Sequence, residues 1–349
     1  MNGTTQSEAQ AMPSGLVHVS DNAPGICRLR RGQRFIYRQP DGLRLSDTHQ
    51  LERIRKLAIP PAYTSVWICP SPRGHLQATG RDARDRKQYL YHADWRNARD
   101  ETKFDRMSDF GAALPRIRST VTHDLEAPLG SQILHRTVVA AIVRLLDTTL
   151  VRVGNDEYAR SNGSFGLTTL RKRHVDVKGN KLRLRFRGKS GVTHEVTLQD
   201  RRITRIVRRC QTLPGQELFQ YLDDASDAHS IGSMDVNDYL RVASGGEFTA
   251  KDFRTWHGSV HALQLWSQLE ASEKAIQTTA IANRLLAEVA GRLGNTVAVC
   301  RKFYVHPSVL ALLNGEAPAT WLSFKNPPPR KVGLTPGERE FLMLLSVSA

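Results

Sequence analysis

Five polar side chains, spread from the middle of the sequence to its C-terminal part, are of the types that a reaction at a phosphodiester needs. In chain order they are Arg152, Lys189, Arg254, Asn295 and Tyr304. A tyrosine can attack phosphorus and hold the phosphate covalently, which keeps the bond energy for resealing. The other four can supply positive charge, hydrogen bonds and a proton donor. This set of residues predicts that a phosphodiester is cleaved and rejoined through a phosphotyrosine, with no metal ion or other cofactor.

The arginines and the lysine address the main energetic difficulty of tyrosine chemistry. A free tyrosine has a pKa of about 10, so ionising it at pH 7 costs roughly 4 kcal/mol, and nearby positive charge lowers that cost. Arg152 and Arg254 can hold phosphate oxygens with rigid forks of donors, most strongly in the more negative transition state. Lys189, in a predicted tight turn, can protonate the leaving 5′ oxygen, which is worth about 10²–10⁴ in rate. Asn295 can donate an amide hydrogen bond to a non-bridging oxygen.

Each of these residues also has a structural explanation that the sequence leaves open. A tyrosine such as Tyr304 is usually a packed ring, and a lone arginine usually forms a structural ion pair. Lys189 fits an ordinary solvated turn, and Asn295, which follows Gly294, fits a helix end. Their combination favours the catalytic interpretation.

The charge of the chain points to a polyanionic partner. The 349 residues include 50 Lys+Arg against 34 Asp+Glu, a net charge of +16, and the excess is spread along the chain. Such a surface attracts a phosphate backbone and releases its counterions. This balance predicts binding to double-stranded DNA.

Several other classes of protein lack sequence support. No run approaches the roughly 18 apolar residues of a membrane helix, and the N-terminus lacks a secretory signal. The four cysteines form no CxxC pair, which suggests a reduced state in the cytoplasm. No HExxH, Walker A or GxGxxG motif occurs. We therefore expect a cytoplasmic, nucleoid-associated protein with no membrane contact and no metal site.

The elements that must position these residues indicate an α+β fold in two domains. Residues 1–22 are polar and predict a disordered tail. Residues 23–98 predict a β-rich, DNA-binding domain with short strands at 34–37, 64–69 and 75–79. One helix interrupts them, capped by Ser46 or Asp47 and stopped by Pro60-Pro61.

Residues 99–349 predict a larger, mainly helical catalytic domain with a small antiparallel sheet. Apolar stripes at helical spacing run from Phe104 to Leu114 and from Leu134 to Leu145, the second ending just before Arg152. Alternating strands with turns at 178–180 and 188–191 fill residues 167–198. Everything after Asp200 has a helical pattern, with breaks near Pro214, Gly245 and Gly294.

The segments around the five polar residues resemble the catalytic set of the type IB DNA topoisomerases, and most closely their compact poxvirus-like and bacterial branch. Those segments are Leu150-Val151-Arg152-Val153-Gly154-Asn155, Arg187-Gly188-Lys189, Lys251-Asp252-Phe253-Arg254-Thr255, Leu293-Gly294-Asn295-Thr296 and Arg301-Lys302-Phe303-Tyr304. Residues 74–82 and 88–91 are similar to the N-terminal domain of that branch. The resemblance implies a monomer that closes as a clamp around duplex DNA and relaxes supercoils through a 3′-phosphotyrosyl intermediate.

The resemblance also implies DNA contacts outside the catalytic set. Gln88, Tyr89 and Tyr91 would lie in the major groove, although alternation on a strand suits ordinary packing equally well. Tyr158 and Lys251 are the other two implied contacts. The basic runs at 171–174 and 201–209 are explained as solvated faces with non-specific attraction at most.

Two positions depart from the poxvirus pattern. Asn295 stands where those enzymes carry histidine, and because it cannot shuttle a proton we expect a flatter rate profile between about pH 5 and pH 8. Asn155 stands where they carry a DNA-reading lysine. The second departure leaves the preferred DNA sequence open.

Two alternatives remain open from the sequence. A tyrosine recombinase uses much the same residues, but recombinases usually carry histidine three residues before the second arginine, where this chain has Lys251. A DNA-binding protein that has lost catalysis would also be basic. Covalent attachment to DNA distinguishes that protein from an enzyme.

Overall fold

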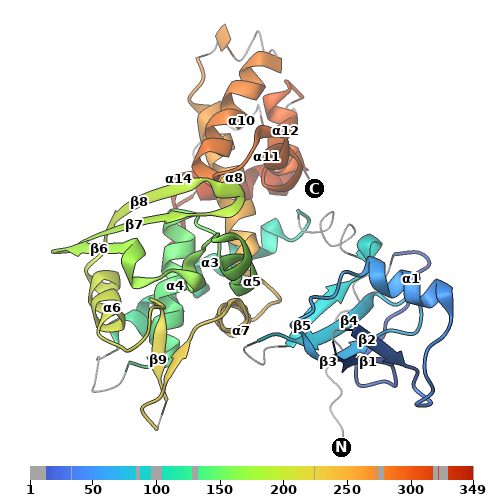
Figure 1. Ribbon diagram of the computed structural model, residues 1–349. Helices are drawn as coiled ribbons and strands as arrows, with labels where there is room; N and C mark the ends of the chain where they lie inside the picture. The colour runs from blue at the N-terminus through green and yellow to red at the C-terminus, as the bar shows by residue number, and fades with distance from the viewer. Residues whose placement is uncertain are drawn as a thin grey trace, which may run out of the picture. The chain divides into compact units, whose positions relative to one another are not determined.

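The computed structural model describes residues 13–32, 34–83, 87–95, 104–127, 133–223, 225–270, 272–273, 279–316, 321 and 329–348 (Figure 1). The chain divides into two compact units, residues 1–103 and 104–349. The domain boundary predicted between residues 98 and 99 lies outside the described residues, so it stays a prediction. The mixture of a small β-rich unit and a mainly helical unit confirms the predicted fold class.

The first unit is a five-stranded antiparallel sheet in the order β2-β1-β3-β4-β5, with one helix. Its strands are β1 Ile26–Arg31, β2 Arg34–Arg38, β3 Thr64–Ile68, β4 Leu76–Arg81 and β5 Lys87–Tyr91. Helix α1, Thr48–Lys56, begins at Asp47, whose carboxylate accepts hydrogen bonds from the backbone N–H groups of residues 49 and 50. Ile54 of this helix packs into a small core with Ile26, Leu45, Val66, Ile68 and Ala78.

The N-terminal segment corrects one prediction. Residues 1–12 lie outside the described residues, but residues 13–22, also predicted to be disordered, are bound to the sheet. Val17 exchanges backbone hydrogen bonds with Arg73 (2.8 Å) and His75 (2.9 Å). The Asp21 carboxylate accepts a hydrogen bond from Thr79 Oγ1 (2.9 Å) and lies 2.5 Å from Lys87 Nζ. Polar composition missed this order because the segment is held by hydrogen bonds rather than by apolar packing.

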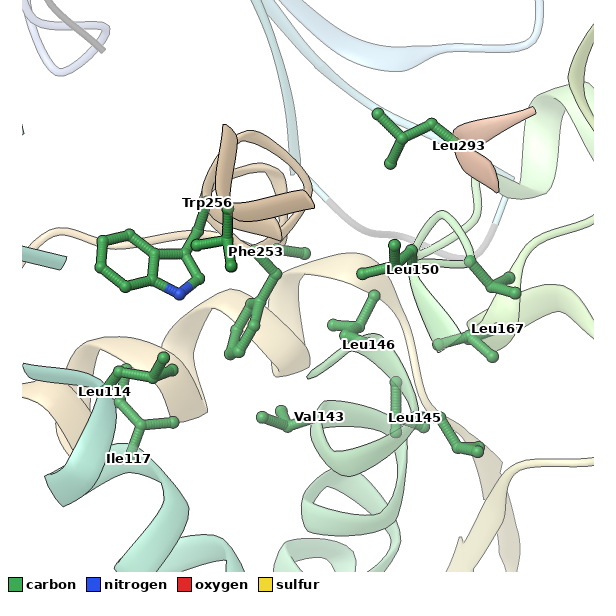
Figure 2. Packing of buried hydrophobic residues seen from close by; sticks show 14 of the residues in the cluster. Leu114, Ile117, Val143, Leu145, Leu146, Leu150, Leu167, Phe253, Trp256 and Leu293 are labelled. Atoms are coloured by element: carbon green, nitrogen blue, oxygen red, sulfur yellow. The ribbon is translucent and has the colours of Figure 1, made fainter. Parts of the chain in front are cut away.

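The second unit is built around the long helix α8, Ala250–Ser267, which is packed by helices on several sides. The other helices are α3 Met107–Glu126, α4 His135–Thr149, α5 Asp156–Asn162, α6 Arg201–Gln211, α7 Ser233–Ser244, α10 Thr279–Leu293, α11 Val297–Phe303, α12 Pro307–Leu313 and α14 Pro336–Ser348. Figure 2 shows Phe253 and Trp256 of α8 among leucine and valine side chains of α3 and α4. Both rings are fully buried, so helix α8 is held firmly.

A three-stranded antiparallel sheet in the order β6-β7-β8 belongs to this unit. Its strands are β6 Val175–Lys178, β7 Lys181–Arg187 and β8 Thr193–Gln199, with a short 3₁₀ turn, Lys189–Gly191, between β7 and β8. The predicted alternation is confirmed, because Leu182, Leu184 and Phe186 are buried while the residues between them are exposed. This hairpin places Lys189 at its tip.

Two details of the helical unit were predicted wrongly. A hairpin of β9, Gln220–Leu222, and β10, Ala228–Ser230, interrupts the region after Asp200 that was predicted to be wholly helical. Its strands of three residues are too short to show a period. Leu134 is not in the buried stripe of α4 but precedes the helix and is 44% exposed. Among the described residues, no helix combines the length and apolar character needed to cross a membrane.

Candidate active site

Tyr304 ends helix α11 and lies directly on helix α8. Its backbone N–H donates to Cys300 O (2.9 Å), which closes the last turn of α11. A Cβ atom at Gly258 of α8 would come within 2.6 Å of Tyr304 O, so only glycine allows this close approach. One turn earlier on α8, the Arg254 guanidinium carbon lies 5.0 Å from the centre of the Tyr304 ring. Backbone packing therefore brings the predicted nucleophile to a predicted phosphate-binding arginine.

Arg254 is 4% exposed and is held in place by backbone carbonyls. Its Nη1 donates to Leu150 O and its Nη2 donates to Leu293 O (2.7 Å). Its Nε is buried and has no hydrogen-bond partner among the described residues. Burial, and then the charge of Arg152, lower the pKa of Arg254, although a guanidinium keeps its proton at any physiological pH. Arg254 is therefore a buried cation whose fork is fixed by the fold.

Arg152 lies in the loop that follows helix α4. The helix ends at Leu150, which adopts a left-handed conformation (φ 60°) and turns the chain. Leu167 N–H donates to Arg152 O (2.9 Å), which ties this loop to the 3₁₀ helix Leu167–Thr169. The Arg152 guanidinium donates to Asn295 Oδ1 and to Gly294 O (3.4 Å). The loop thus joins one predicted arginine to the predicted asparagine.

Asn295 follows the end of helix α10. Gly294 has a φ of +58° and terminates the helix, and Asn295 N–H donates back to Ala290 O (2.9 Å). Because an arginine can only donate, its bond to Oδ1 leaves the amide Nδ2 as the free donor. Nδ2 is buried and has at most a weak interaction with the Cys300 thiol, whose pKa burial raises to about 11. Asn295 is both a helix-end residue and a directed hydrogen-bond donor.

Positive charge is not balanced by negative charge in the cluster formed by Arg152, Arg254, Asn295 and Tyr304. Among the described residues, no carboxylate lies within 4.0 Å of the guanidinium of Arg152 or of Arg254. Two buried donors, Arg254 Nε and Asn295 Nδ2, have no proper acceptor there. Buried polar groups without partners are costly and uncommon. An anion with several oxygens, such as a phosphodiester, matches the missing charge and the missing acceptors.

Lys189 stands apart from the other four residues. Its side chain is exposed at the tip of the β7–β8 hairpin, and within the described part of the chain no hydrogen bond joins it to Arg152, Arg254, Asn295 or Tyr304. The hairpin nevertheless meets the cluster through His194 of β8. A Cβ atom at Gly294 would lie 2.6 Å from His194 Cε1. Sequence reasoning did not find His194, because a ring that acts through packing against distant glycines stands in no local motif.

Comparison with known proteins decides the family. Residues 92–317 match the family model for the catalytic core of eukaryotic DNA topoisomerase I, and residues 34–82 match the model for the N-terminal domain of bacterial DNA topoisomerase IB. DNA topoisomerase 1B of Acanthamoeba polyphaga mimivirus is 32% identical over 314 residues, which cover 87% of this chain and 92% of the relative. The chain belongs to the type IB DNA topoisomerases.

More distant viral relatives of this topoisomerase agree with that placement. DNA topoisomerase 1B of Vaccinia virus (strain Copenhagen) is 21% identical over 245 residues, 68% of this chain and 72% of the relative. DNA topoisomerase 1 of Rabbit fibroma virus is 21% identical over 278 residues, 76% and 82% of the two chains. The predicted resemblance to the compact branch is confirmed.

The DNA contacts predicted for this topoisomerase lie in both units. Gln88, Tyr89 and Tyr91 are on the edge strand β5, where the two tyrosine rings stack 6.2 Å apart and Tyr89 is 43% exposed. Gln88 Nε2 donates to Asp82 (3.0 Å). In the second unit, Lys251 is exposed one turn before Arg254, and Tyr158 on α5 is 59% exposed. These positions suit contact with DNA, and their role stays a prediction.

The basic run on helix α6 has structural partners within the topoisomerase. Arg205 donates to Leu125 O (2.9 Å) and Arg208 donates to Gly179 O (2.6 Å). Arg202 pairs with the Glu126 carboxylate. These arginines cap the end of α3 and the β6–β7 turn. Their structural contacts explain much of the basic run on α6, so DNA binding is not needed to explain it.

Proposed function

We propose that this topoisomerase relaxes supercoiled duplex DNA by cutting and resealing one strand through Tyr304. Tyr304 gives up its proton to water, its oxygen attacks a phosphodiester and bonds to phosphorus, and the bond from phosphorus to the 5′ oxygen breaks. The 3′ end then stays attached to the protein while the free 5′ end rotates. Attack by the 5′ hydroxyl reverses the step and releases Tyr304.

The observation that carries this proposal is a pair of arginines, Arg254 beside Tyr304 and Arg152 beside Asn295, with no described carboxylate at ion-pair distance. Arg152 and Arg254 would hold the two non-bridging oxygens, and Asn295 Nδ2 would donate to one of them. Such donors are fixed before the reaction, so they stabilise the transition state without reorganisation. Since the arginines already supply the positive charge, the reaction needs neither a metal ion nor ATP.

Lys189 would supply the proton that the departing 5′ oxygen takes up. In the proposed step the hairpin tip closes on bound DNA and brings the ammonium to the 5′ oxygen. We further propose that the enzyme acts as a monomeric clamp on chromosomal DNA, which would place it in the cytoplasm with the nucleoid. The exposed residues Tyr89, Tyr158 and Lys251 would serve as its contacts to duplex DNA.

The test is relaxation of negatively supercoiled plasmid in EDTA without ATP, compared between the natural protein and Tyr304→Phe. We expect relaxation by the natural protein and none by the variant, with nearly equal DNA binding, because only the nucleophilic oxygen is lost. Tyr221→Phe, in the β9–β10 hairpin, is the matched control and should relax normally. Relaxation by Tyr304→Phe would refute the assignment of Tyr304 as the nucleophile.

The recombinase and the inactive DNA-binder predict different outcomes of the same assay. A binder gives neither relaxation nor a covalent adduct. A recombinase gives an adduct but joins strands from two specific sites, which a circular plasmid carrying two such sites reports as deletion or inversion.

A further inference from the structure

One imidazole joins the hairpin that carries Lys189 to the turn that carries Asn295. His194 is the second residue of β8 and pairs across the hairpin with Phe186 of β7. The two rings are stacked, 5.2 Å apart and 13° from parallel. Because Phe186 is buried in the core of the unit, the stack anchors the base of the hairpin tip.

The same imidazole fills the space beside two glycines that lie far apart in the sequence. A Cβ atom at Gly188, immediately before Lys189, would come within 2.5 Å of His194 Cδ2. A Cβ atom at Gly294, immediately before Asn295, would come within 2.6 Å of His194 Cε1. Each glycine therefore lacks a side chain where the ring lies, and the ring touches the backbone next to both functional residues.

The character of the ring suits packing rather than hydrogen bonding. Within the described residues, His194 forms no hydrogen bond through its ring nitrogens. Burial, then the charges of Arg152 and Arg254, lower its pKa, so the ring is neutral near pH 7. A flat, neutral ring can lie beside two cations without adding a third charge.

We propose that His194 is a positioning residue. Its ring, wedged between Gly188 and Gly294, holds Lys189 where the ammonium can reach the 5′ oxygen. This inference rests on the proposed function, because it acts through the general acid. Without the wedge, the tip of the hairpin loses its contact with the Gly294–Asn295 turn. Arg254 keeps its bonds to Leu150 O and Leu293 O, and Tyr304 keeps its packing on Gly258. The turn that holds Arg152 keeps the hydrogen bond from Asn295 N–H to Ala290 O, so proton donation suffers most.

The test is single-turnover cleavage of duplex DNA with either oxygen or sulfur at the 5′ bridging position. A thiolate leaves without a proton, so a sulfur substrate bypasses a defect in the general acid. With the oxygen substrate we expect Lys189→Ala to slow cleavage on the order of 10²–10⁴-fold and His194→Ala on the order of 10–10²-fold. With the sulfur substrate both variants should approach the natural rate.

Two further variants separate the wedge from other roles. His194→Phe keeps a flat ring of similar size and should stay within a few-fold of the natural protein on both substrates. His229→Ala, a histidine in the exposed β9–β10 hairpin, is the control and should cleave normally. If His194→Ala does not fold, His194→Gln takes its place, because glutamine keeps the polarity but not the ring.

The outcomes distinguish this inference from the proposed function. Equal slowing of His194→Ala on both substrates, while Lys189→Ala is rescued by sulfur, would overturn the positioning role and leave the general acid standing. A loss in His194→Phe as large as in His194→Ala would also overturn it, because the nitrogens rather than the ring shape would then matter. No rescue of Lys189→Ala would reject the acid assignment itself, and no covalent cleavage by the natural protein would reject the proposed function.

Discussion

Two arginine clusters lie at different places along helix α8, and they differ in how their charge is balanced. In the first, which we call the paired cluster, Arg118 binds Asp147 (2.8 Å) and Glu338 (2.7 Å), and His257 Nε2 lies 2.9 Å from Asp147. In the second, the unpaired cluster, Arg152 and Arg254 face Asn295 and Tyr304 without a described carboxylate at ion-pair distance. His257 and Arg254, three residues apart on α8, belong to different clusters.

The paired cluster is complete without a ligand. Burial alone would raise the pKa of Asp147, but hydrogen bonds from His257 and Arg118 outweigh it and hold that pKa well below its ordinary range. Trp256 Nε1 donates to Glu338 (3.1 Å), so the cluster ties α3, α4, α8 and α14 together. The unpaired cluster keeps two cations and two orphaned donors, which would be a defect in a structural site. If the proposed function holds, charge balance rather than burial separates Arg118, which holds the fold, from Arg152 and Arg254, which would bind the phosphate.

The largest expected effect is on stability, in the paired cluster. Arg118→Ala leaves two buried carboxylates without their cation, so the free energy of unfolding should fall by about 3–5 kcal/mol. Denaturant unfolding measures this loss. Cleavage per folded molecule should change little, and a loss of activity with unchanged stability would break the comparison.

For the unpaired cluster we expect the opposite: a large loss of activity with little change in stability. Arg152→Ala removes a donor from the developing charge, so single-turnover cleavage should slow on the order of 10²–10³-fold. Its unfolding free energy should stay within about 1 kcal/mol, because a repulsion with Arg254 disappears together with the hydrogen bonds to Gly294 and Asn295. A destabilisation as large as that of Arg118→Ala would show that Arg152 is structural after all.

The segment that follows Tyr304 should lose stability in a different pH window from the paired cluster. Burial lowers the pKa of His306, two residues after Tyr304, from its ordinary 6.5 to about 4. Between these values the unfolded chain binds a proton that the folded chain does not, so stability falls as pH drops from about 6.5 to 4, by up to about 3 kcal/mol. The carboxylates of the paired cluster have lowered pKa values and lose their contribution only in stronger acid.

Substitutions assign the two windows. In His306→Phe, urea unfolding at a series of pH values should show a shallower loss between pH 6.5 and 4. In Asp147→Asn, which is less stable at neutral pH, that slope should remain while the decline in stronger acid becomes weaker. An unchanged slope in His306→Phe would mean that other buried histidines carry the acid sensitivity.

The smallest expected effect is stabilisation of the fold by a bound anion, which the unpaired cluster should bind and the paired cluster should not. Inorganic sulfate should stabilise the natural protein by about 1.4 kcal/mol at ten times its Kd, because the unpaired cluster exists only in the folded chain. Thermal melting should lose this increment in Arg152→Ala and keep it in Arg118→Lys. Equal sulfate stabilisation in both variants would place the anion elsewhere.

The members of the unpaired cluster could be predicted from the sequence because each lies in a short motif, and it is the combination of these motifs in one order that favours catalysis over the structural explanation of each residue. The β7–β8 hairpin was predictable for a similar reason, since Leu182, Leu184 and Phe186 alternate with charged residues. His257 and Trp256 stand in none of the catalytic motifs, and both are structural: His257 bonds to Asp147 and Trp256 is buried.

What the sequence could not supply depends on contacts between distant positions. Arg118 and Glu338 are single residues on helices 220 positions apart, and neither stands in a motif. His194 matters through the space that Gly188 and Gly294 leave, which no local pattern records. The order of residues 13–22 likewise depends on Asp21 reaching Thr79 and Lys87.

The proposed role of Tyr304 is tested most directly by identifying the residue and the DNA end that are joined when the reaction is trapped with detergent. A duplex labelled separately at each end of the cut strand would be incubated with the protein in EDTA, denatured, digested with protease and analysed by peptide mass spectrometry. We expect one adduct, in which Tyr304 carries a 3′ phosphate. An adduct on another residue, an attachment to the 5′ end, or cleavage without any adduct would contradict it.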